Sequence, residues 1–514
     1  MSLLKHELIE EREYQKAIAE KASKGNTLVV LPTGMGKTLI ALFVATNRLE
    51  KIPESKILIT APTRPLNAQH KKFFEKFTTI PPEEIALITG KISPEKRSKI
   101  YQEAKIITAT PQTIENDLKA NRISLENFSL VVFDEAHRAV KDYSYPIIAK
   151  KYMLQAKNPL ILALTASPGG SYERIKEINE NLFIRQVEIR TERENDVLPY
   201  VKTVQKEFIY IELPEEFKKI QQLLNEAKKE DIYWLREHYF LKSYVGSKKE
   251  LLELQKKISE KYHEGTKDPS LMWAMIKTAS ALKIEHALEL LETQGISFLH
   301  DYFKKLEKSK KQVDKRILKN ENIKEAIRII EELYLKHVDH PKLEKILNIT
   351  KDILKEKPKA KIIIFANYRS TVEKIKNLLE ENGIESEILV GQAVKEGKGM
   401  TQQQQIETIK NFSSGMFNVL IGTSISEEGL DIPAVDFAIF YESVPSEIRN
   451  IQRRGRVGRQ TVGKVLFLIT KDTRDEVYFW ASLQKERKMK GILYDLKEKC
   501  MKKKKESLLD FIKV

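Results

Sequence analysis

The sequence predicts two α/β domains, each built on a parallel sheet, with a mainly helical insertion between them. Two series of short apolar runs, separated by helical patterns, predict the sheets, and a middle segment with apolar residues at helical spacing predicts the insertion. Strands that are apolar along their whole length are typical of parallel sheets, which helices cover on both faces. At 514 residues, the chain is long enough for more than one core.

The two series of apolar runs set the expected domain boundaries. The first series extends from Thr27 to Leu164, and the second from Ile362 to Ile469. Between them, Phe217, Ile220 and Leu224 are three and four residues apart, as on one face of a helix. We therefore expect a first α/β domain at 1–202, a helical insertion at 203–335, a second α/β domain at 336–485 and a basic tail at 486–514.

The charge and the cysteine content restrict the class of protein. The chain has 89 Lys and Arg against 73 Asp and Glu, a net charge of +16, which predicts attraction to a polyanion. Charge alone does not distinguish a nucleic acid from an acidic membrane surface. The single cysteine, Cys500, excludes an intramolecular disulfide, and no apolar run has the length of a membrane span. With no signal-peptide core at its start, the protein is expected to be cytoplasmic.

A candidate phosphate-binding loop follows the first apolar strand and opens a helical stretch. Its sequence is Leu-Pro-Thr-Gly-Met-Gly-Lys-Thr, residues 31–38. The small residues allow backbone N–H groups to surround phosphates, Lys37 would reach the β and γ oxygens, and the Thr38 hydroxyl would bind Mg²⁺. The first glycine of the general pattern is Leu31 here, and a plain glycine-rich turn is the alternative. The strand before and the helix after favour nucleotide binding, through Thr33, Gly34, Gly36, Lys37 and Thr38.

Two carboxylates, Asp134 and Glu135, follow the apolar run 130–133. The carboxyl ends of parallel strands are where such sheets bind ligands. We assign Asp134 to Mg²⁺ and Glu135 to activation of the attacking water. An ordinary acidic turn would be the better interpretation of an isolated Asp-Glu pair, but not beside the Lys37 loop.

A third element lies in the second α/β domain, where arginines alternate with glycines in the segment 452–459. The guanidinium groups of Arg456 and Arg459 could stabilise the charge that develops on a γ-phosphate during its transfer. A basic nucleic-acid patch is the alternative. If both arginines complete a site whose phosphates lie on the first domain, ATP binds between the domains.

Together with these segments, several others in the correct order resemble the motifs of superfamily two DNA and RNA helicases, whose two domains are RecA-like. The further matches are Arg-Glu-Tyr-Gln at 12–15, Ala-Pro-Thr-Arg-Pro-Leu at 61–66, Thr-Ala-Thr-Pro-Gln at 108–112, Thr-Ala-Ser at 165–167, and 364–369 and 422–433 in the second domain. The resemblance implies ATP binding by Arg12, Gln15, Gly429 and Asp431, and a catalytic role for Gln452 beside the arginines. It also implies contacts with a nucleic-acid backbone by Thr63, Arg64, Thr110, Asn367, Arg369 and Thr423.

Within the superfamily, the DEAH sequence, the helical insertion and the arginine segment look most like the archaeal Hef family and its Fanconi-anaemia M relatives. This resemblance implies an ATP- and Mg²⁺-dependent DNA helicase or translocase of DNA repair, acting on branched DNA such as stalled replication forks and associated with the nucleoid. The alternative is an RNA-directed ATPase of the Dicer and RIG-I-like group, whose members share a helical insertion.

The insertion and the tail carry two further interpretations. Six aromatic residues lie among lysines: Tyr233, Trp234, Tyr239, Phe240, Tyr244 and Trp273. Such rings either stack on unpaired bases or pack in a core, and their helical spacing favours the core. We hypothesise that the insertion recognises the branch. In the tail, Leu508, Phe511 and Ile512 resemble a sliding-clamp peptide, but Lys505 stands where such peptides have glutamine. A plain amphipathic helix end is the favoured interpretation there.

Overall fold

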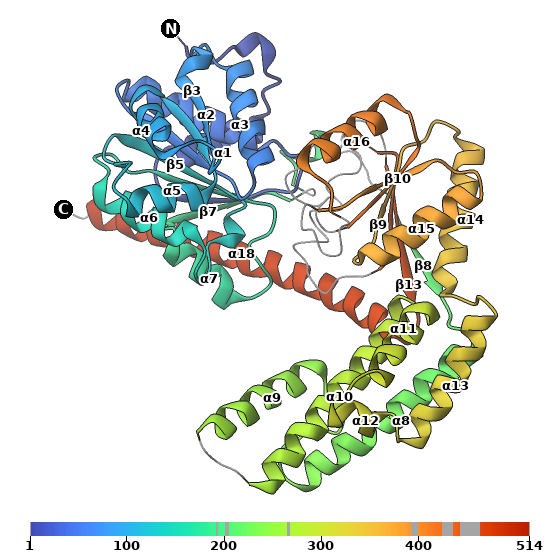
Figure 1. Cartoon of the computed structure of the whole chain (residues 1–514). Coiled ribbons are helices and arrows are strands. Elements are labelled where there is room, and N and C mark those ends of the chain that lie inside the picture. Colours follow the sequence, from blue (N-terminus) through green and yellow to red (C-terminus); the bar gives the residue numbers. More distant parts are fainter. Residues whose placement is uncertain are drawn as a thin grey trace.

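The computed structural model describes residues 2–191, 194–200, 205–264, 268–391, 399–423, 435–442 and 463–512, without the side chains of 497 and 499–512. Two α/β domains lie next to each other, a helical bundle extends from the second domain, and one long helix runs back to the first (Figure 1). Each α/β domain contains one parallel sheet. The predicted fold class is therefore confirmed.

The first domain contains a seven-stranded sheet in which every strand pair is parallel. Alternate residues of β1 point to opposite faces: Leu28 and Val30 belong to one buried cluster, and Val29 and Leu31 to the other. The core is thus split into two layers, one on each face. In sheet order the strands are β3 (Ile85–Ile88), β4 (Ile106–Ala109), β2 (Lys56–Thr60), β5 (Phe128–Asp134), β6 (Ile161–Thr165), β1 (Thr27–Val30) and β7 (Gln186–Ile189).

Helices cover both faces of this sheet (Figure 1). They are α1 (Glu13–Ala22), α2 (Lys37–Lys51), α3 (Arg64–Phe77), α4 (Pro94–Glu103), α5 (Pro111–Lys119), α6 (Ser144–Gln155) and α7 (Tyr172–Asn181). Because most of these helices start just after a strand, their N-termini lie at the carboxyl edge of the sheet. That edge carries the predicted motifs.

The second domain contains a six-stranded parallel sheet with α15 (Arg369–Glu381) and α16 (Gln402–Ser414). One strand, β8, comes from residues 205–211, which we had placed in the helical insertion. It pairs with β13 at the edge of the sheet and is largely exposed. It has an apolar run, residues 208–211, but that run stands alone before the long helices of the insertion and was counted with them. In sheet order the strands are β10 (Ser386–Leu389), β11 (Val419–Gly422), β9 (Ile362–Phe365), β12 (Phe437–Phe440), β13 (Lys464–Thr470) and β8 (Gln205–Ile211).

The insertion is a bundle with two adjoining apolar clusters. Its helices are α8 (Glu215–Glu237), α9 (Lys248–His263), α10 (Pro269–Thr293), α11 (Ile296–Glu307), α12 (Gln312–Ile317) and α13 (Glu321–Leu335), and α14 (Pro341–Glu356) then leads into the second sheet. Of the six predicted aromatic side chains, Trp234 and Phe240 pack against one of these clusters, as the favoured interpretation expects. The other four are exposed by half or more, contrary to it: Tyr233 at 63%, Tyr239 at 96%, Tyr244 at 76% and Trp273 at 50%.

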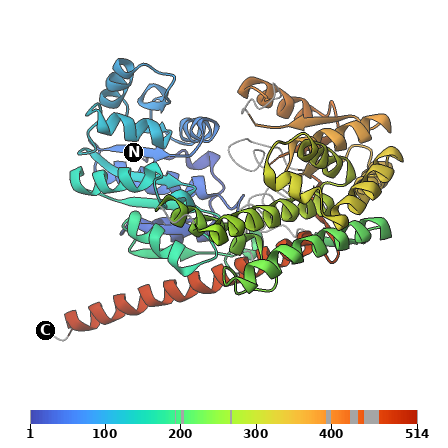
Figure 2. The ribbon, with the colours of Figure 1, turned by 60° about the horizontal axis from the view of Figure 1, so that its bottom comes forward.

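The residues that we expected as a separate basic tail continue a single helix, α18 (Arg474–Ile512). It begins at the second domain and packs against the first, and its C-terminal end projects beyond that domain (Figures 1 and 2). Met489 and Leu493 are buried in the core of the first domain, and Met489 Sδ lies 2.9 Å from Ser167 Oγ. These apolar contacts, four residues apart, explain why the helix does not break at residue 485. Neither α18 nor any other helix of the described ranges is long and apolar enough to cross a membrane.

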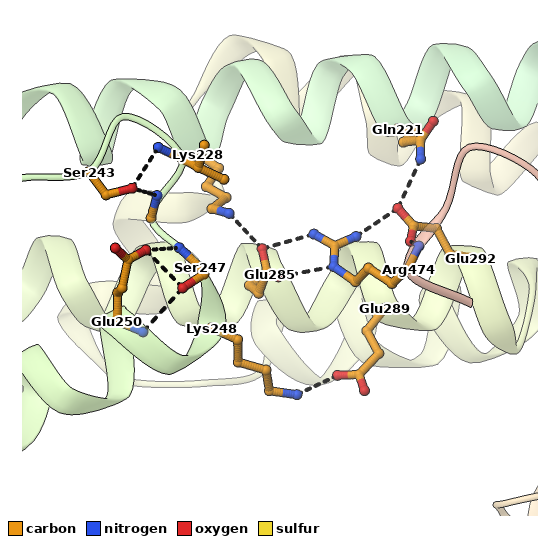
Figure 3. A network of polar contacts seen from close by, with 12 residues as sticks. Gln221, Lys228, Ser243, Ser247, Lys248, Glu250, Glu285, Glu289, Glu292 and Arg474 are labelled. Atoms are coloured by element: carbon orange, nitrogen blue, oxygen red, sulfur yellow. Dashed lines mark hydrogen bonds and ion pairs between the residues drawn. The ribbon is translucent and has the colours of Figure 1, made fainter. Parts of the chain in front are cut away.

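Arg474, at the start of α18, joins the insertion to the second domain (Figure 3). Its guanidinium group donates to both carboxylate oxygens of Glu285, at 3.0 and 2.9 Å, and to Glu292 at 2.7 Å, while its backbone N–H donates to the other oxygen of Glu292. Both glutamates belong to α10 and are buried. Paired geometry of this kind fixes both position and direction.

A second buried pair lies beside Arg474. Lys342 Nζ lies 2.5 Å from the carboxylate of Asp475, and neither side chain is exposed to solvent. Lys342 also donates to the carbonyl of Tyr441, at the end of β12. His340 caps α14, accepting from the Lys342 N–H through Nδ1, and donates through Nε2 to the Glu292 carbonyl. We call the six residues Glu285, Glu292, His340, Lys342, Arg474 and Asp475 the junction.

Candidate active site

The candidate phosphate loop connects β1 to α2. Gly34 has φ +83° and Gly36 has φ +74°, left-handed conformations that glycine adopts without strain. Gly36 is the N-cap of α2, so the loop ends at a helix N-terminus, where backbone N–H groups and the helix dipole attract anions. Lys37 Nζ donates to the carbonyls of Leu31, at 3.0 Å, and Pro32, at 3.4 Å. These contacts hold the ammonium group at the start of the loop.

Gln15, the expected adenine-binding residue, supports this loop from behind. Its Nε2 donates to the Met35 carbonyl at 3.1 Å, and Tyr14 OH donates to the same carbonyl at 2.9 Å. A Cβ atom at Gly36 would lie 2.2 Å from Gln15 Nε2, so only glycine fits there. Gln15 Oε1 is buried and has no hydrogen-bond partner among the described residues, which leaves an acceptor for an amino group. Arg12 lies 5.0 Å from the ring centre of Tyr200, a contact that no sequence motif indicated.

Asp134 and Glu135 lie where β5 ends, and every residue of that strand is buried. Glu135 has φ +52°, a strained conformation that turns the chain sharply after the strand. Burial raises the pKa of Asp134, but the hydrogen bond from His70 and the positive charge of Lys37 outweigh it, and the pKa lies below its usual range. Asp134 is therefore ionised at neutral pH.

Glu135 is held from the other side by His137. His137 Nδ1 lies 3.2 Å from Glu135 Oε2 and 3.3 Å from Thr165 Oγ1, the first residue of the Thr-Ala-Ser segment. His70 Nε2 lies 2.9 Å from Asp134 Oδ2. Sequence reasoning did not assign a role to either histidine. His137 belongs to a quoted motif, whereas His70 stands on α3 without any signal in the sequence.

The residues at this edge fit a Mg²⁺ ion bound with a nucleotide. Mg²⁺ keeps several waters and takes one or two carboxylate or hydroxyl ligands plus phosphate oxygens. Asp134 offers an ionised carboxylate, and Thr38 stands in the first turn of α2. In the described part of the chain, no group of three or more His, Cys, Asp and Glu side chains could hold a metal ion by itself, so the ion would need ligands from the nucleotide and water.

The predicted nucleic-acid residues of the first domain lie at the same edge, beyond β5. Thr63 is the N-cap of α3, and its hydroxyl accepts from the Leu66 N–H. Thr110 is the N-cap of α5. Because the strands run in the order β4, β2, β5, β6, β1, the edge presents Thr110, then Thr63, then Asp134, then Thr165 and finally the phosphate loop. The acidic pair thus separates the phosphate side from the side predicted for a strand.

The second sheet repeats this placement. Asn367 follows β9, Arg369 opens α15, and Thr423 follows β11, the neighbouring strand. Arg369 donates to the Gly391 carbonyl at 3.0 Å, and the Asn367 N–H donates to Glu442 at 2.7 Å. Five predicted residues lie outside the described ranges, so their place in the site stays a prediction: Gly429, Asp431, Gln452, Arg456 and Arg459.

Comparison with known proteins identifies three family regions along the chain. Residues 12–175 match the "DEAD/DEAH box helicase" family, residues 342–461 the "Helicase conserved C-terminal domain", and residues 216–337 the family "Putative ATP-dependent RNA helicase, helical bundle". The chain is 46% identical to the "Putative ATP-dependent RNA helicase MJ1505" of Methanocaldococcus jannaschii, over 96% of this chain and 62% of that protein. It is 35% identical to the "ATP-dependent DNA helicase fml1" of Schizosaccharomyces pombe, over 90% of this chain and 57% of that protein. The chain thus spans less than two thirds of these relatives.

A solved structure covers nearly the whole chain. The Hef helicase domain of Pyrococcus furiosus is 46% identical, matches 93% of this chain and 100% of its own, and superimposes with a TM-score of 0.74. Both family models of the α/β domains and this structure agree with the order of motifs along the sequence. The chain therefore belongs to the Hef-like superfamily two helicases.

Proposed function

We propose that this helicase translocates on DNA and acts on branched DNA such as a stalled fork. The observation that carries the proposal is the order of groups along the carboxyl edge of the first sheet, with phosphate-binding residues at one end and the N-caps Thr63 and Thr110 at the other. Hydroxyls and backbone N–H groups at helix N-termini contact sugar-phosphate chains without reading sequence. Relatives named DNA helicases match 90% or more of the chain.

The groups proposed for ATP hydrolysis lie on the phosphate-loop side of this edge and in the second domain. Lys37 and Thr38 would bind the triphosphate and Mg²⁺ with Asp134, and bound Mg²⁺ would neutralise the charge of the phosphates. Glu135, oriented by His137, accepts a proton from the attacking water. Arg456 and Arg459 of the second domain complete the site in our proposal, so that closure of the domains accompanies hydrolysis.

An RNA-directed activity is the second candidate, because the M. jannaschii relative and the helical-bundle family both carry the name RNA helicase. Stimulation of ATP hydrolysis separates the two candidates. We expect forked DNA to stimulate most, linear single-stranded DNA less, and RNA of the same sequences least. Equal or greater stimulation by RNA would overturn the DNA assignment, and equal stimulation by forked and linear DNA would overturn the preference for branches.

The exposed aromatic residues of the insertion are the proposed contact with the branch. Tyr239 and Tyr244 follow α8 and are exposed, as is Lys242 between them, and the Arg236 guanidinium covers one face of the Tyr244 ring, 3.2 Å from the ring centre. A base stacked on such a ring contributes about 1–3 kcal/mol. The double variant Tyr239→Ala, Tyr244→Ala should therefore lower fork affinity about tenfold or more and leave linear-strand affinity unchanged. Tyr334→Ala, at an exposed site on α13, is the control, and an unchanged fork preference in the double variant contradicts the proposal.

A clamp contact through Leu508, Phe511 and Ile512 stays a prediction. Their side chains lie outside the described part of α18.

A further inference from the structure

His70 is a buried histidine that no motif of the family accounts for. It lies on α3, one face of which is buried, and is 3% exposed. Its Nε2 is 2.9 Å from Asp134 Oδ2. Asp134 is the residue assigned to Mg²⁺. His70 contacts its carboxylate from α3, which follows β2, whereas the phosphate loop follows β1 on the other side of β5.

The hydrogen bond has a defined direction. An ionised carboxylate only accepts, so His70 must donate from Nε2. Among protein atoms of the described residues, His70 Nδ1 has no partner, so the Nε2 contact is the hydrogen bond that orients the ring. The other carboxylate oxygen, Asp134 Oδ1, accepts from the Glu135 N–H at 3.0 Å. Two donors thus fix the rotation of the carboxylate, and each oxygen keeps a lone pair for other ligands.

The helix that carries His70 begins at the proposed nucleic-acid contact. Thr63 caps α3 and Arg64 is its first residue. Asn67, fully buried one turn later, holds this turn to the helix: its Nδ2 donates to the carbonyls of Ala61, at 2.8 Å, and Thr63, at 2.9 Å, and its Oδ1 accepts from the Ala61 N–H. The turn and the helix therefore move together.

One further contact ties the ends of β2 and β5. Tyr145 OH lies 2.6 Å from the Asp134 carbonyl and 3.2 Å from the Thr60 carbonyl, with the ring fully buried. This contact fixes the backbone at Asp134. His70 is then the contact through which a shift of α3 would reach the Asp134 side chain.

We propose that His70 is a positioning residue that orients Asp134 for Mg²⁺ and transmits occupancy of the Thr63–Arg64 turn to the metal site. The second half of this inference rests on the proposed function, since it requires a nucleic-acid strand at that turn. The first half does not. Groups that hydrogen-bond to a metal-binding carboxylate typically change metal affinity by about 10- to 100-fold when removed.

The test compares three variants. His70→Ala removes the donor, His70→Gln keeps an N–H donor at the place of Nε2, and Gln69→Ala changes the exposed neighbour on the same helix. Binding of Mn²⁺ in the presence of a non-hydrolysable ATP analogue, followed by electron paramagnetic resonance, measures the metal site without turnover. Hydrolysis with and without polynucleotide, and strand affinity by fluorescence anisotropy, complete the set.

We expect His70→Ala to weaken Mn²⁺ binding about tenfold or more, to lose most of the stimulation by polynucleotide and to keep its strand affinity. His70→Gln should recover most of both properties, and Gln69→Ala should match the wild type. Wild-type Mn²⁺ affinity and stimulation in His70→Ala would overturn the inference. So would equal damage in the alanine and glutamine variants, because a purely structural role would not be rescued by a donor.

Failure of the proposed function gives a different result. If no polynucleotide stimulates the wild type, while His70→Ala still weakens Mn²⁺ binding and His70→Gln restores it, then His70 positions Asp134 but the proposed strand contact is wrong. Thermal unfolding of each variant identifies loss of the fold, and His70→Gln then carries the test.

Discussion

The junction and the carboxyl edge of the first sheet both bury charged side chains, but they differ in whether other side chains supply the hydrogen-bond and ion-pair partners. At the junction, Arg474 reaches both oxygens of Glu285, and Lys342 is enclosed with Asp475. At the edge, Lys37 donates to two carbonyls of its own loop, and among the described residues Gln15 Oε1 and His70 Nδ1 have no hydrogen-bond partner. A network whose members satisfy each other fixes geometry, whereas unpaired capacity is available to a ligand. We therefore expect variants of the edge to change activity, and variants of the junction to change stability.

The largest expected effect is on hydrolysis. Glu135→Gln removes the proposed base, and general-base catalysis contributes about 10²- to 10⁴-fold, so the rate should fall by that factor while ATP binding persists. Single-turnover hydrolysis and binding of a fluorescent ATP analogue measure the two quantities. Glu126→Gln changes an exposed glutamate of the same domain and should have no effect. Hydrolysis that persists in Glu135→Gln shows that another residue is the base.

The largest effect on stability is expected at Arg474. Its replacement by alanine removes the guanidinium group from two buried glutamates. Glu285 keeps Lys228 at 2.7 Å, but Glu292 keeps only the neutral amide of Gln221 and a backbone N–H, and breaking a buried pair from one side costs about 3–5 kcal/mol. Denaturant unfolding measures this loss. Arg328→Ala removes an arginine that also pairs with two glutamates, but at the surface of α13, and should leave the unfolding free energy nearly unchanged. Similar losses in the two variants would contradict the contrast between buried and exposed pairs.

The junction should also make stability depend on pH through His340. Burial lowers the pKa of His340 to about 3, from an ordinary value of 6.5. The unfolded chain therefore takes up this proton first, so the free energy of unfolding falls as pH decreases from about 6.5 toward 3, by about 1 kcal/mol per pH unit from this group.

His340→Asn keeps a side-chain acceptor at the cap of α14 but does not titrate. It should be less stable than the wild type at pH 7.5 and lose less stability between pH 7.5 and 5.5. Denaturant unfolding at both pH values tests this, and parallel pH dependence in the two proteins would show that His340 is not the titrating group.

The smallest effect is expected at Lys248, which pairs with Glu289 at 2.6 Å beside the junction. Lys248 is 44% exposed, and exposed pairs contribute about 0–1 kcal/mol. Glu289 also lies 3.7 Å from His286 and so keeps a partner. Lys248→Ala should change the unfolding free energy by about 0.5 kcal/mol or less. A loss as large as that of Arg474→Ala would show that burial does not set the strength of these pairs.

The same contrast explains what the sequence could predict. The phosphate loop and the Asp134–Glu135 pair follow apolar strands directly, so their neighbourhood in space follows from their place at strand ends. The two sheets were predicted for the same reason. β8 was missed because its short apolar run, residues 208–211, is separated from the other strands of its sheet by the whole insertion. The continuity of α18 was missed because a Lys-rich helix and a Lys-rich tail have the same composition.

Partners far apart in the sequence could not be predicted. Arg474 is 189 residues from Glu285, and Lys342 is 133 residues from Asp475. His70 and Asp134 are 64 residues apart, and a histidine on an amphipathic helix is equally compatible with an ordinary core position. These contacts depend on the packing of whole elements, which local patterns do not encode.

Closure of the two α/β domains around a nucleotide is the central claim, and a distance measurement tests it most directly. The spin labels are attached to introduced cysteines in a Cys500→Ala background. Labels at Leu154→Cys on α6 and Met416→Cys after α16 measure the distance between the two α/β domains. Labels at Met416→Cys and Leu252→Cys on α9 measure the distance between the second domain and the insertion. All three side chains are exposed by half or more. We predict that an ATP analogue with Mg²⁺ and single-stranded DNA shortens the first distance and leaves the second unchanged. An unchanged distance between the two α/β domains would contradict the account.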